Sequence, residues 1–81
     1  MFYVYVLKSL KNNRFYTGLT SNLEKRIIEH NLGQSKYTSL TRPFKLVYKE
    51  EYGTRGEAYR RELFLKSGKG RELLKSFVKD K

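Results

Sequence analysis

The fold of this chain is decided by one stretch, FYVYVLKSLKNNRFYTGL, residues 2–19. Residues 2–8 are apolar or aromatic at nearly every position, a pattern typical of a central strand covered on both faces. Residues 14–19 form a second short strand, and the polar segment 9–13 between the two contains an Asn-Asn pair, which turns favour. These features predict an antiparallel hairpin at the start of the chain.

The register of this hairpin decides which side chains meet across it. If residues 9–12 form the loop, Tyr5 lies directly opposite Tyr16 on one face of the sheet, whereas a slip of one residue separates the two. Aromatic packing across the strands is the simple explanation for such a pair. A buried Tyr hydroxyl needs a hydrogen-bond partner, however, so two Phe rings would pack more simply. We therefore interpret the tyrosines as hydroxyls that line an active face, with ordinary packing as the alternative.

Downstream of the hairpin, two capping boxes predict two helices. SNLE at 21–24 and TRGE at 54–57 each place a hydroxyl where it accepts the backbone N–H of the glutamate three residues later, while the carboxylate reaches back to the cap. The first helix should run over about residues 22–32 and the second over residues 54–67. Each is expected to stop at the glycine that follows, which is Gly33 and Gly68 respectively.

The remaining segments predict one more strand and one more helix. In FKLVYKEEY, residues 44–52, apolar side chains recur at every second position at the start, which predicts a half-buried strand with Phe44, Leu46 and Tyr48 on one face. In GRELLKSFVK, residues 70–79, four apolar side chains fall on one helical stripe: Leu73, Leu74, Phe77 and Val78. The element order is therefore ββαβαα, a mixed α/β class of the α+β type, and residues 1–81 are expected to form a single domain.

The charge balance points to a polyanionic partner. Lys and Arg number 18 against 8 Asp and Glu, which gives a net charge of +10 and a pI of about 10.0. The basic residues are spread along the chain rather than gathered in a tail, so the charge belongs to the folded surface. Nucleic acid explains this imbalance better than a merely soluble surface does. A membrane surface explains it less well, because no segment joins a broad apolar face to a continuous basic face.

Several kinds of site and location are excluded or disfavoured by composition. The chain has no cysteine and one histidine, so it can form neither a disulfide framework nor a thiolate or histidine-rich metal site. Any metal ion must be held mainly by oxygen. The N-terminus lacks the long apolar run of a signal peptide or membrane helix, so we expect a cytoplasmic location and no membrane association.

One carboxylate falls inside an apolar stripe of the second predicted helix. At 100° per residue, Glu62 lies on the same narrow arc as Ala58 and Leu65. A buried, unpaired charge is costly, so such a glutamate pairs, takes up a proton or binds a cation. The structural alternative is an ion pair with Arg61 or Lys66.

Two polar residues share one face of the first predicted helix. Arg26 and His30 are four residues apart and border the apolar stripe of Leu23 and Ile27. Taken singly, a solvated arginine and a histidine bonded to the backbone are adequate explanations. Together with the facing tyrosines and the carboxylate on the second helix they form a coherent set: hydroxyls for water, a guanidinium for phosphate and one carboxylate for a metal ion.

These residues, in this order and at these spacings, resemble a known family. The pattern consists of Tyr3-Val4-Tyr5, Tyr16-Thr17-Gly18, Arg26, His30, and Glu57-Ala58 leading to Glu62. It resembles the GIY-YIG nuclease superfamily, in particular its small stand-alone bacterial members related to the N-terminal domain of the excision-repair endonuclease. The similarity covers nearly the whole chain, and KYT at 36–38 and RPFKLVY at 42–48 look like the small-protein branch.

The resemblance implies a fold, an activity and a set of roles. The family fold is a three-stranded antiparallel sheet flanked by helices, and its activity is hydrolysis of DNA phosphodiesters with one divalent ion, Mg²⁺ or Mn²⁺, in settings that include DNA repair. By position, Tyr5 and Tyr16 would be the motif tyrosines, Arg26 the phosphate-binding arginine, His30 an auxiliary histidine and Glu62 the metal ligand. Gly18 would be a structural residue, and nucleic-acid contacts are assigned to Lys36, Tyr37, Arg42 and Arg61.

Several points stay open at this level. Gly18 leaves the backbone uncovered, which would let a phosphate or the first helix approach closely. Leu19 replaces a polar or basic residue that many nuclease members carry after the motif glycine. The general base is not decided between a tyrosine and His30. The alternative function is a non-catalytic nucleic-acid-binding module of the same fold, and RNA is the alternative to DNA. Oligomeric state is not predicted.

Overall fold

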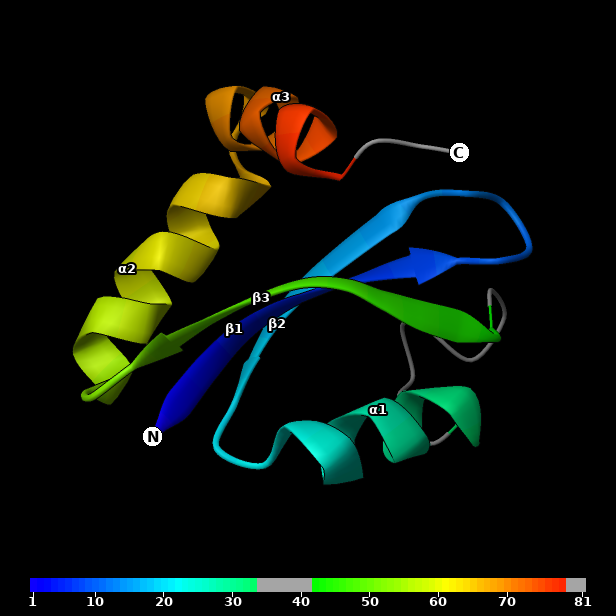
Figure 1. Ribbon diagram of the computed structural model, residues 1–81, viewed down its shortest axis with the longest axis horizontal. Coiled ribbons are helices and arrows are strands. Elements are labelled where there is room, and N and C mark those ends of the chain that lie inside the picture. The colour runs from blue at the N-terminus through cyan, green and yellow to red at the C-terminus, as the bar shows by residue number, and fades with distance from the viewer. Residues whose placement is uncertain (34–41, 79–81) are drawn as a thin grey trace.

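Three strands and three helices follow one another in the predicted order, ββαβαα. The computed structural model describes residues 1–33 and 42–78, and the elements within them are β1 (Phe2–Ser9), β2 (Phe15–Thr20), α1 (Leu23–Asn31), β3 (Phe44–Tyr52), α2 (Arg55–Lys66) and α3 (Gly68–Phe77). The strands form one antiparallel sheet in the order β2-β1-β3. Figure 1 shows α1 on one side of this sheet and α2 with α3 on the other. The predicted fold class is confirmed.

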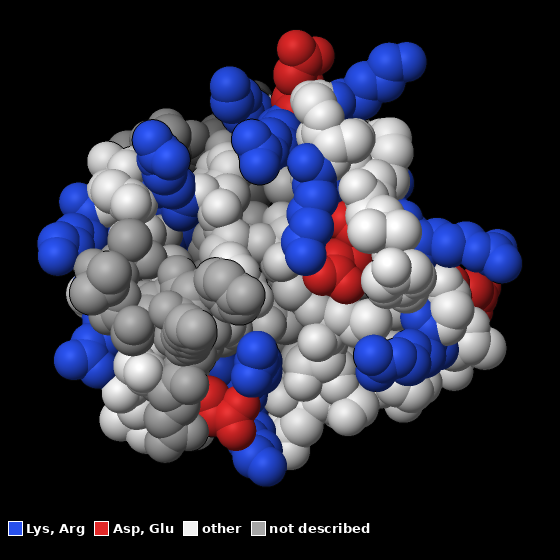
Figure 2. Space-filling model, turned by 180° about the vertical axis from the view of Figure 1, so that it is seen from behind, with Lys and Arg blue, Asp and Glu red and all other residues white. Residues whose placement is uncertain are grey.

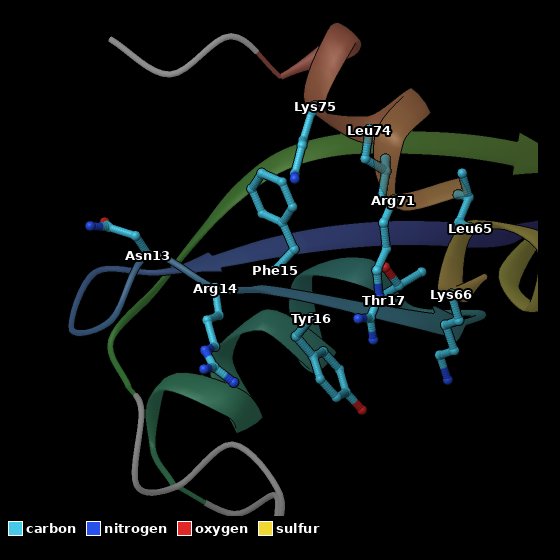
Figure 3. A pocket seen from close by; sticks show the side chains of 10 residues that line it. All are labelled: Asn13, Arg14, Phe15, Tyr16, Thr17, Leu65, Lys66, Arg71, Leu74 and Lys75. Atoms are coloured by element: carbon cyan, nitrogen blue, oxygen red, sulfur yellow. The ribbon is translucent and has the colours of Figure 1, made fainter. Parts of the chain in front are cut away.

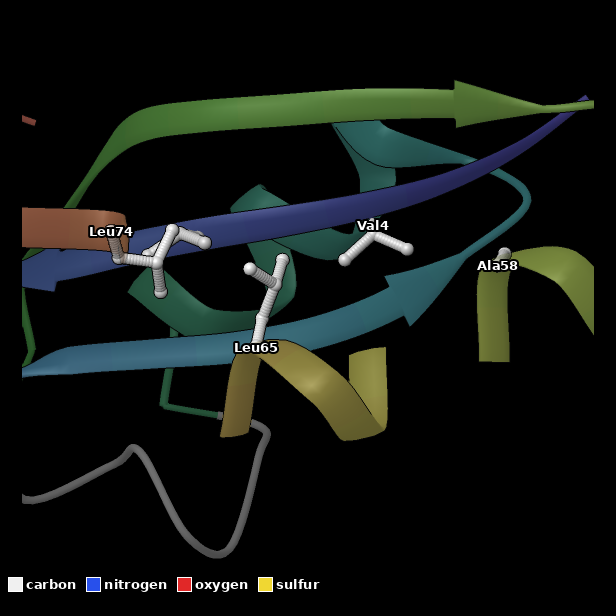
Figure 4. Packing of buried hydrophobic residues seen from close by; sticks show 5 residues of the cluster. Val4, Ala58, Leu65 and Leu74 are labelled. Carbon is white, nitrogen blue, oxygen red and sulfur yellow. The ribbon is translucent and has the colours of Figure 1, made fainter. Parts of the chain in front are cut away.

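The central strand β1 is covered on both faces, as its apolar pattern predicts. Val4 and Val6 are fully buried and pack with residues of α2 and α3, and Figure 4 shows the side chains of this cluster between the sheet and the helices. Tyr5 and Leu7 point the other way and pack beneath α1. The sheet thus separates two apolar clusters, and the tyrosine face belongs to α1.

The hairpin register differs by two residues from the expected one. Tyr5 pairs with Gly18 and Tyr16 with Leu7, so the two tyrosines are diagonal rather than opposite. The reason lies in the loop. The Ser9 N–H donates to Arg14 O at 2.9 Å, and the Ser9 side chain accepts the N–H groups of Lys11 and Asn12, which lengthens the strands by one pair. Because the shift is an even number, Tyr5 and Tyr16 keep the same face.

The alternation predicted for the third strand breaks at a β-bulge. Val6 pairs with Tyr48 while Leu7 pairs with Leu46, so Val47 is an extra residue in β3. Phe44 and Leu46 pack on the α1 face as expected, but Tyr48 packs on the α2 and α3 face. The prediction that Tyr48 shares a face with Leu46 is therefore wrong, because one inserted residue reverses the side-chain alternation that follows it.

The helix starts differ in detail from the predicted capping boxes. Asn22, not Ser21, caps α1, and its side chain accepts the Lys25 N–H at 3.2 Å. Thr54 caps α2 as predicted, accepting the Glu57 N–H at 3.3 Å. Ser67 ends α2 and also caps α3, so α3 begins at Gly68 instead of near Gly70. Gly68 therefore opens a helix, where it was expected to end one. No helix in residues 1–33 and 42–78 has the length and apolar character needed to cross a membrane.

Two polar contacts fix the helices against the third strand. The Asn31 side chain at the end of α1 accepts the Phe44 N–H at 2.6 Å and donates to Phe44 O at 3.3 Å. On the other face, Arg61 of α2 donates to both carboxylate oxygens of Glu50 on β3, at 2.9 and 3.1 Å. These contacts hold α1 and α2 in place, and both helices carry residues of the candidate site.

Candidate active site

The hydroxyl of Tyr5 reaches the edge of the sheet by crossing over Gly18. Gly18 is the direct partner of Tyr5 in the hairpin, and a Cβ atom at that position would lie 2.5 Å from Cζ of the tyrosine ring. That separation is far inside van der Waals contact, so a side chain at Gly18 would displace the ring. The expectation that Gly18 admits a phosphate or the first helix is corrected: it makes room for the Tyr5 ring, because the register places the two residues opposite each other.

A chain of hydrogen bonds links three of the predicted site residues. The Arg26 Nε–H donates to the Tyr5 hydroxyl oxygen at 3.4 Å, and that hydroxyl lies 3.0 Å from Nε2 of His30. Because a guanidinium can only donate, the Tyr5 O–H donates onward to Nε2, and His30 accepts in its Nδ1–H tautomer. β1 and α1 therefore join a cation, a hydroxyl and an imidazole in one directed series.

Burial keeps both Tyr5 and His30 uncharged. Burial raises the pKa of Tyr5 to about 12, and the hydrogen bond from Arg26 does not offset it, while the charges of Tyr16 and Glu62 act in the same direction as burial. Burial also lowers the pKa of His30 from its ordinary value, and the positive charge of Arg26 lowers it further. Near neutral pH the series orients Arg26 without carrying charge of its own.

Of the two motif tyrosines, Tyr16 is the accessible one. Tyr5 is 1 % exposed and His30 0 %, so nothing bound at the surface touches either side chain in this arrangement. Tyr16 is half-buried, with its ring 4.9 Å from His30 and 6.5 Å from Tyr5 between centroids. Within residues 1–33 and 42–78 its hydroxyl has no hydrogen-bond partner. Tyr16 is therefore the tyrosine that can meet water or substrate, and Tyr5 and His30 are positioning residues.

Arg26 presents a cation beside Tyr16 at the surface. Its side chain is 38 % exposed and is held from two sides, by Tyr5 through Nε and by Glu29, whose Oε1 lies 3.2 Å from Nη1. Neither of these bonds uses Nη2. A guanidinium with one fixed side and one free edge can bind a phosphate oxygen in a defined direction.

Glu62 approaches the site from the other helix layer. Its side chain is only 14 % exposed, and Oε2 lies 2.7 Å from Nζ of Lys66, one turn later on α2. The predicted alternative partner Lys66 is thus real, whereas Arg61 pairs with Glu50 instead. The negative charge of Glu62 contributes to the raised pKa of Tyr5, so the carboxylate lies within electrostatic range of the tyrosine series.

The donor chemistry of Glu62 fits a hard, well-hydrated cation. In the part of the chain that the structure describes, no three residues among His, Cys, Asp and Glu gather into a metal-binding group. One carboxylate is sufficient for Mg²⁺, which keeps several waters and takes substrate phosphate oxygens as ligands. The ion would take the place that the Lys66 ammonium occupies on Oε2. Glu62 is therefore the residue that would hold it.

The other predicted residues are distributed around the molecule. Lys36 and Tyr37 lie outside the described residues. Arg42 is exposed, and its guanidinium covers Gly33 just after α1. Arg61 is engaged by Glu50 on the α2 face of the sheet, away from Arg26, so its assignment to nucleic acid competes with a structural role. Leu19 packs in the cluster beneath α2, and its side chain therefore does not face Tyr5.

Sequence reasoning missed one polar cluster. Glu50 accepts from both nitrogens of the Arg61 fork and from the hydroxyls of Tyr48 and Tyr52, the latter at 2.5 Å. Burial alone raises the pKa of Glu50, but these hydrogen bonds outweigh it and the pKa lies below its ordinary value. The signal was present: Tyr-x-Glu-x-Tyr on a strand places three polar groups on one face.

Comparison with known proteins agrees with this geometry. The model of the GIY-YIG catalytic domain matches residues 1–75. The chain belongs to the GIY-YIG family. It is 45 % identical over 74 residues to a UPF0213 protein of Staphylococcus saprophyticus, covering 90 % of this chain and 89 % of the relative. It is 51 % identical over 67 residues to a UPF0213 protein of Clostridium perfringens, covering 82 % and 71 %.

A solved structure shows the same likeness. The solution NMR structure of a UPF0213 protein from Bacillus halodurans is 38 % identical, with a TM-score of 0.57 over 94 % of this chain and 84 % of that chain. The GIY-YIG family is a nuclease family, and its members generally depend on a divalent metal ion and act on nucleic acid. The printed names of the UPF0213 relatives give no activity.

Proposed function

We propose that this protein is a divalent-metal-dependent endonuclease that hydrolyses phosphodiester bonds in DNA. The observation that carries the proposal is the convergence of Tyr16, Arg26 and Glu62 around the buried Tyr5–His30 hydrogen bond. The basic surface supplies affinity for the substrate: Figure 2 shows Lys and Arg spread over one face, with acidic side chains at only a few points.

The residues at the edge of the sheet divide the reaction among them. Arg26 binds a non-bridging oxygen of the scissile phosphate through its free edge and stabilises the charge that grows there. The Tyr16 hydroxyl orients the attacking water. The water oxygen forms a bond to phosphorus, the bond from phosphorus to the 3′ oxygen breaks, and the proton released by the water balances the one taken up by the leaving oxygen.

Glu62 supplies the one carboxylate that the site needs. A divalent ion bound there would neutralise negative charge on the leaving oxygen and the phosphate. The carboxylate is held close to its working position by α2, which the Glu50–Arg61 pair fixes to β3. Neither Tyr5 nor His30 contacts the substrate: they set the direction of the Arg26 guanidinium.

A non-catalytic nucleic-acid-binding module is the second candidate, and the net charge of +10 is the observation that favours it. The two candidates differ at Glu62. A module that only binds phosphates gains nothing from a half-buried carboxylate beside Arg26, and its affinity for DNA should rise when that charge is removed.

The decisive experiment compares wild type with Glu62→Gln and a matched control, Glu72→Gln, an exposed glutamate on α3. Labelled duplex and branched DNA are incubated with Mg²⁺ or Mn²⁺, and binding of the same DNAs is measured in EDTA. We expect cleavage to fall at least about 100-fold in Glu62→Gln alone, with binding kept. Cleavage by Glu62→Gln at the wild-type rate, or binding without cleavage in all three proteins, would reject the proposal.

A further inference from the structure

A groove runs along the open edge of β2, between this strand and the helices α2 and α3. Its volume is about 700 Å³, within the range of ligand-binding clefts. β2 is an edge strand of the sheet, so this wall of the groove has no neighbouring strand. The residues that matter for its chemistry are Arg14, Phe15, Tyr16, Lys66, Arg71 and Lys75, and Figure 3 shows them.

The walls of the groove carry a concentration of positive charge. Arg14 comes from the start of β2, Lys66 from the end of α2, and Arg71 and Lys75 from one face of α3. None of the described lining residues is acidic. Lys66 shares Glu62, whereas the other three cations have no acidic partner in residues 1–33 and 42–78. Cations left unpaired on two facing walls favour a ligand with more than one phosphate.

Phe15 gives this charged groove an aromatic surface. The ring is half-buried against the cluster beneath α2, and Figure 3 shows the end of Lys75 beside it. Bases in a duplex are paired and stacked internally, so they offer no free face to a ring in a groove. An unpaired base does, and stacking on aromatic side chains together with cationic walls is how proteins bind single strands.

The groove is continuous with the candidate active site. Tyr16 lines it and points away from β2 in the direction opposite to Phe15, as Figure 3 shows. Lys66, on the opposite wall, contacts Glu62. A strand whose phosphate lies at Tyr16 and Glu62 therefore has a direct path along β2 to Phe15.

We propose that this groove binds unpaired nucleotides of the DNA strand next to the scissile phosphate, with their phosphates on Arg14, Arg71 and Lys75 and a base on Phe15. The preferred substrate is then DNA that carries a single-stranded segment beside the cut, rather than continuous duplex. This inference rests on the proposed function for the word "scissile", but the groove's affinity for unpaired strand is testable without cleavage.

The test measures binding by fluorescence anisotropy in EDTA, with no divalent ion, to three labelled DNAs of shared sequence: single strand, continuous duplex, and duplex with a single-stranded arm. The groove variant is Arg71→Gln/Lys75→Gln. Its control, Arg55→Gln/Arg60→Gln, removes the same charge from exposed positions of α2. Phe15→Leu removes the ring and keeps an apolar side chain. Thermal unfolding checks that each variant folds.

We expect the groove variant to bind the single strand and the armed duplex about tenfold more weakly, with a salt dependence lower by about one to two counterions, while the control changes binding about twofold or less. Phe15→Leu should weaken binding of these two DNAs about fivefold and leave continuous duplex unchanged. Wild-type affinity in the groove variant would overturn the inference. So would equal losses on all three DNAs in Phe15→Leu, because the groove would then follow duplex phosphates.

The two proposals can fail separately. If the groove variants behave as expected but wild type cleaves none of these DNAs with Mg²⁺ or Mn²⁺, the proposed activity is rejected and the single-strand groove stands. If wild type cleaves with dependence on Glu62 but the groove variants bind and cleave like wild type, the groove is rejected and the nuclease stands.

Discussion

The hydroxyl of Tyr5 lies 3.0 Å from Nε2 of His30, although the two residues are 25 positions apart in the chain. Both side chains are buried, so this bond forms only when α1 is packed on β1. Arg26 lies one turn before His30 on α1 and donates to the same hydroxyl. The direction of a surface cation is thus fixed by a bond in the interior of the protein.

The two motif tyrosines should give different phenotypes. Tyr5→Phe keeps the ring over Gly18 and loses only the contacts to Arg26 and His30, so we expect single-turnover cleavage to fall about tenfold as Arg26 loses its orientation. Tyr16→Phe removes the accessible hydroxyl, and cleavage should fall at least about 100-fold with DNA affinity unchanged. A folded Tyr5→Phe protein as inactive as Tyr16→Phe would place the Tyr5 hydroxyl in the chemistry itself.

Stability should fall on mild acidification because of His30. Its pKa is lowered in the folded protein by burial and by Arg26, despite the opposing charge of Glu29, so the unfolded chain binds a proton more readily. The stability that the neutral imidazole contributes is therefore complete above the unfolded pKa of about 6.5 and is lost as pH falls toward the folded value.

His30→Gln tests this dependence. The Gln carbonyl can still accept from Tyr5, but it does not titrate, and the chain has no other histidine. Urea unfolding between about pH 7 and pH 5.5 should show wild type losing stability by up to about 1.4 kcal/mol per pH unit, with a flatter profile in His30→Gln. Parallel profiles for the two proteins would show that His30 is protonated as easily in the folded state as in the unfolded one.

Sequence patterns predict the elements and their faces well because those depend on local periodicity. The apolar run of β1 identifies a strand covered on both sides, and the parity of the hairpin keeps Tyr5 and Tyr16 together even though the register is shifted by two. The bulge at Val47 and the choice of Asn22 over Ser21 as a cap depend on how single residues fit in three dimensions. Such choices differ by small energies that periodicity does not carry.

The candidate site was less accessible to sequence reasoning, because solvent exposure is a tertiary property. Tyr5 and Tyr16 occupy equivalent places in the sequence pattern, and only the packing of α1 buries one and leaves the other half-exposed. In the same way, nothing local distinguishes Arg61, which Glu50 engages, from Arg71, which faces the groove.

The Glu50 cluster should stabilise the fold above acidic pH. The Glu50 pKa is lowered, so its contribution is present above the unfolded pKa of about 4.3 and is lost as pH falls through the lower folded value. Glu50→Gln removes the charge from three donors, and we expect a loss of about 2 kcal/mol in the free energy of unfolding near pH 7. The control Glu51→Gln, an exposed neighbour on β3, should change it by less than about 0.5 kcal/mol.

At about pH 3 the difference between wild type and Glu50→Gln should shrink, because the carboxyl group is then largely protonated in both the unfolded and the folded state. Urea denaturation at the two pH values measures this. An equal loss for Glu50→Gln and Glu51→Gln near neutral pH would mean that the Arg61 fork contributes no more than an exposed charge does.

Lys66 should compete with a metal ion for Glu62. Its ammonium contacts Oε2 at 2.7 Å while the lysine side chain remains 49 % exposed, so the pair is screened and weak. We expect Lys66→Gln to strengthen Mn²⁺ binding about threefold, measured by calorimetry without DNA, while Lys69→Gln on α3 leaves it unchanged. Weaker Mn²⁺ binding in Lys66→Gln would show that the lysine supports the site instead of competing for it.

Gly18→Ala should disrupt the site through one added methyl group. The new Cβ would lie 2.5 Å from Cζ of Tyr5, so the ring must leave β2 and the bonds to Arg26 and His30 must break. We expect a loss of about 2 to 3 kcal/mol in the free energy of unfolding and near-complete loss of cleavage. Gly53→Ala is the control, since nothing lies within 4 Å of a Cβ there.

A double-mutant cycle with Tyr5→Leu separates this clash from a general intolerance of alanine in β2. With the ring absent, Gly18→Ala should cost less than about 1 kcal/mol, because the space over the glycine is then free. An equal cost in both backgrounds would contradict the geometry. The glycine of the second motif would then serve the backbone of β2, and its role would have nothing to do with the tyrosine of the first motif.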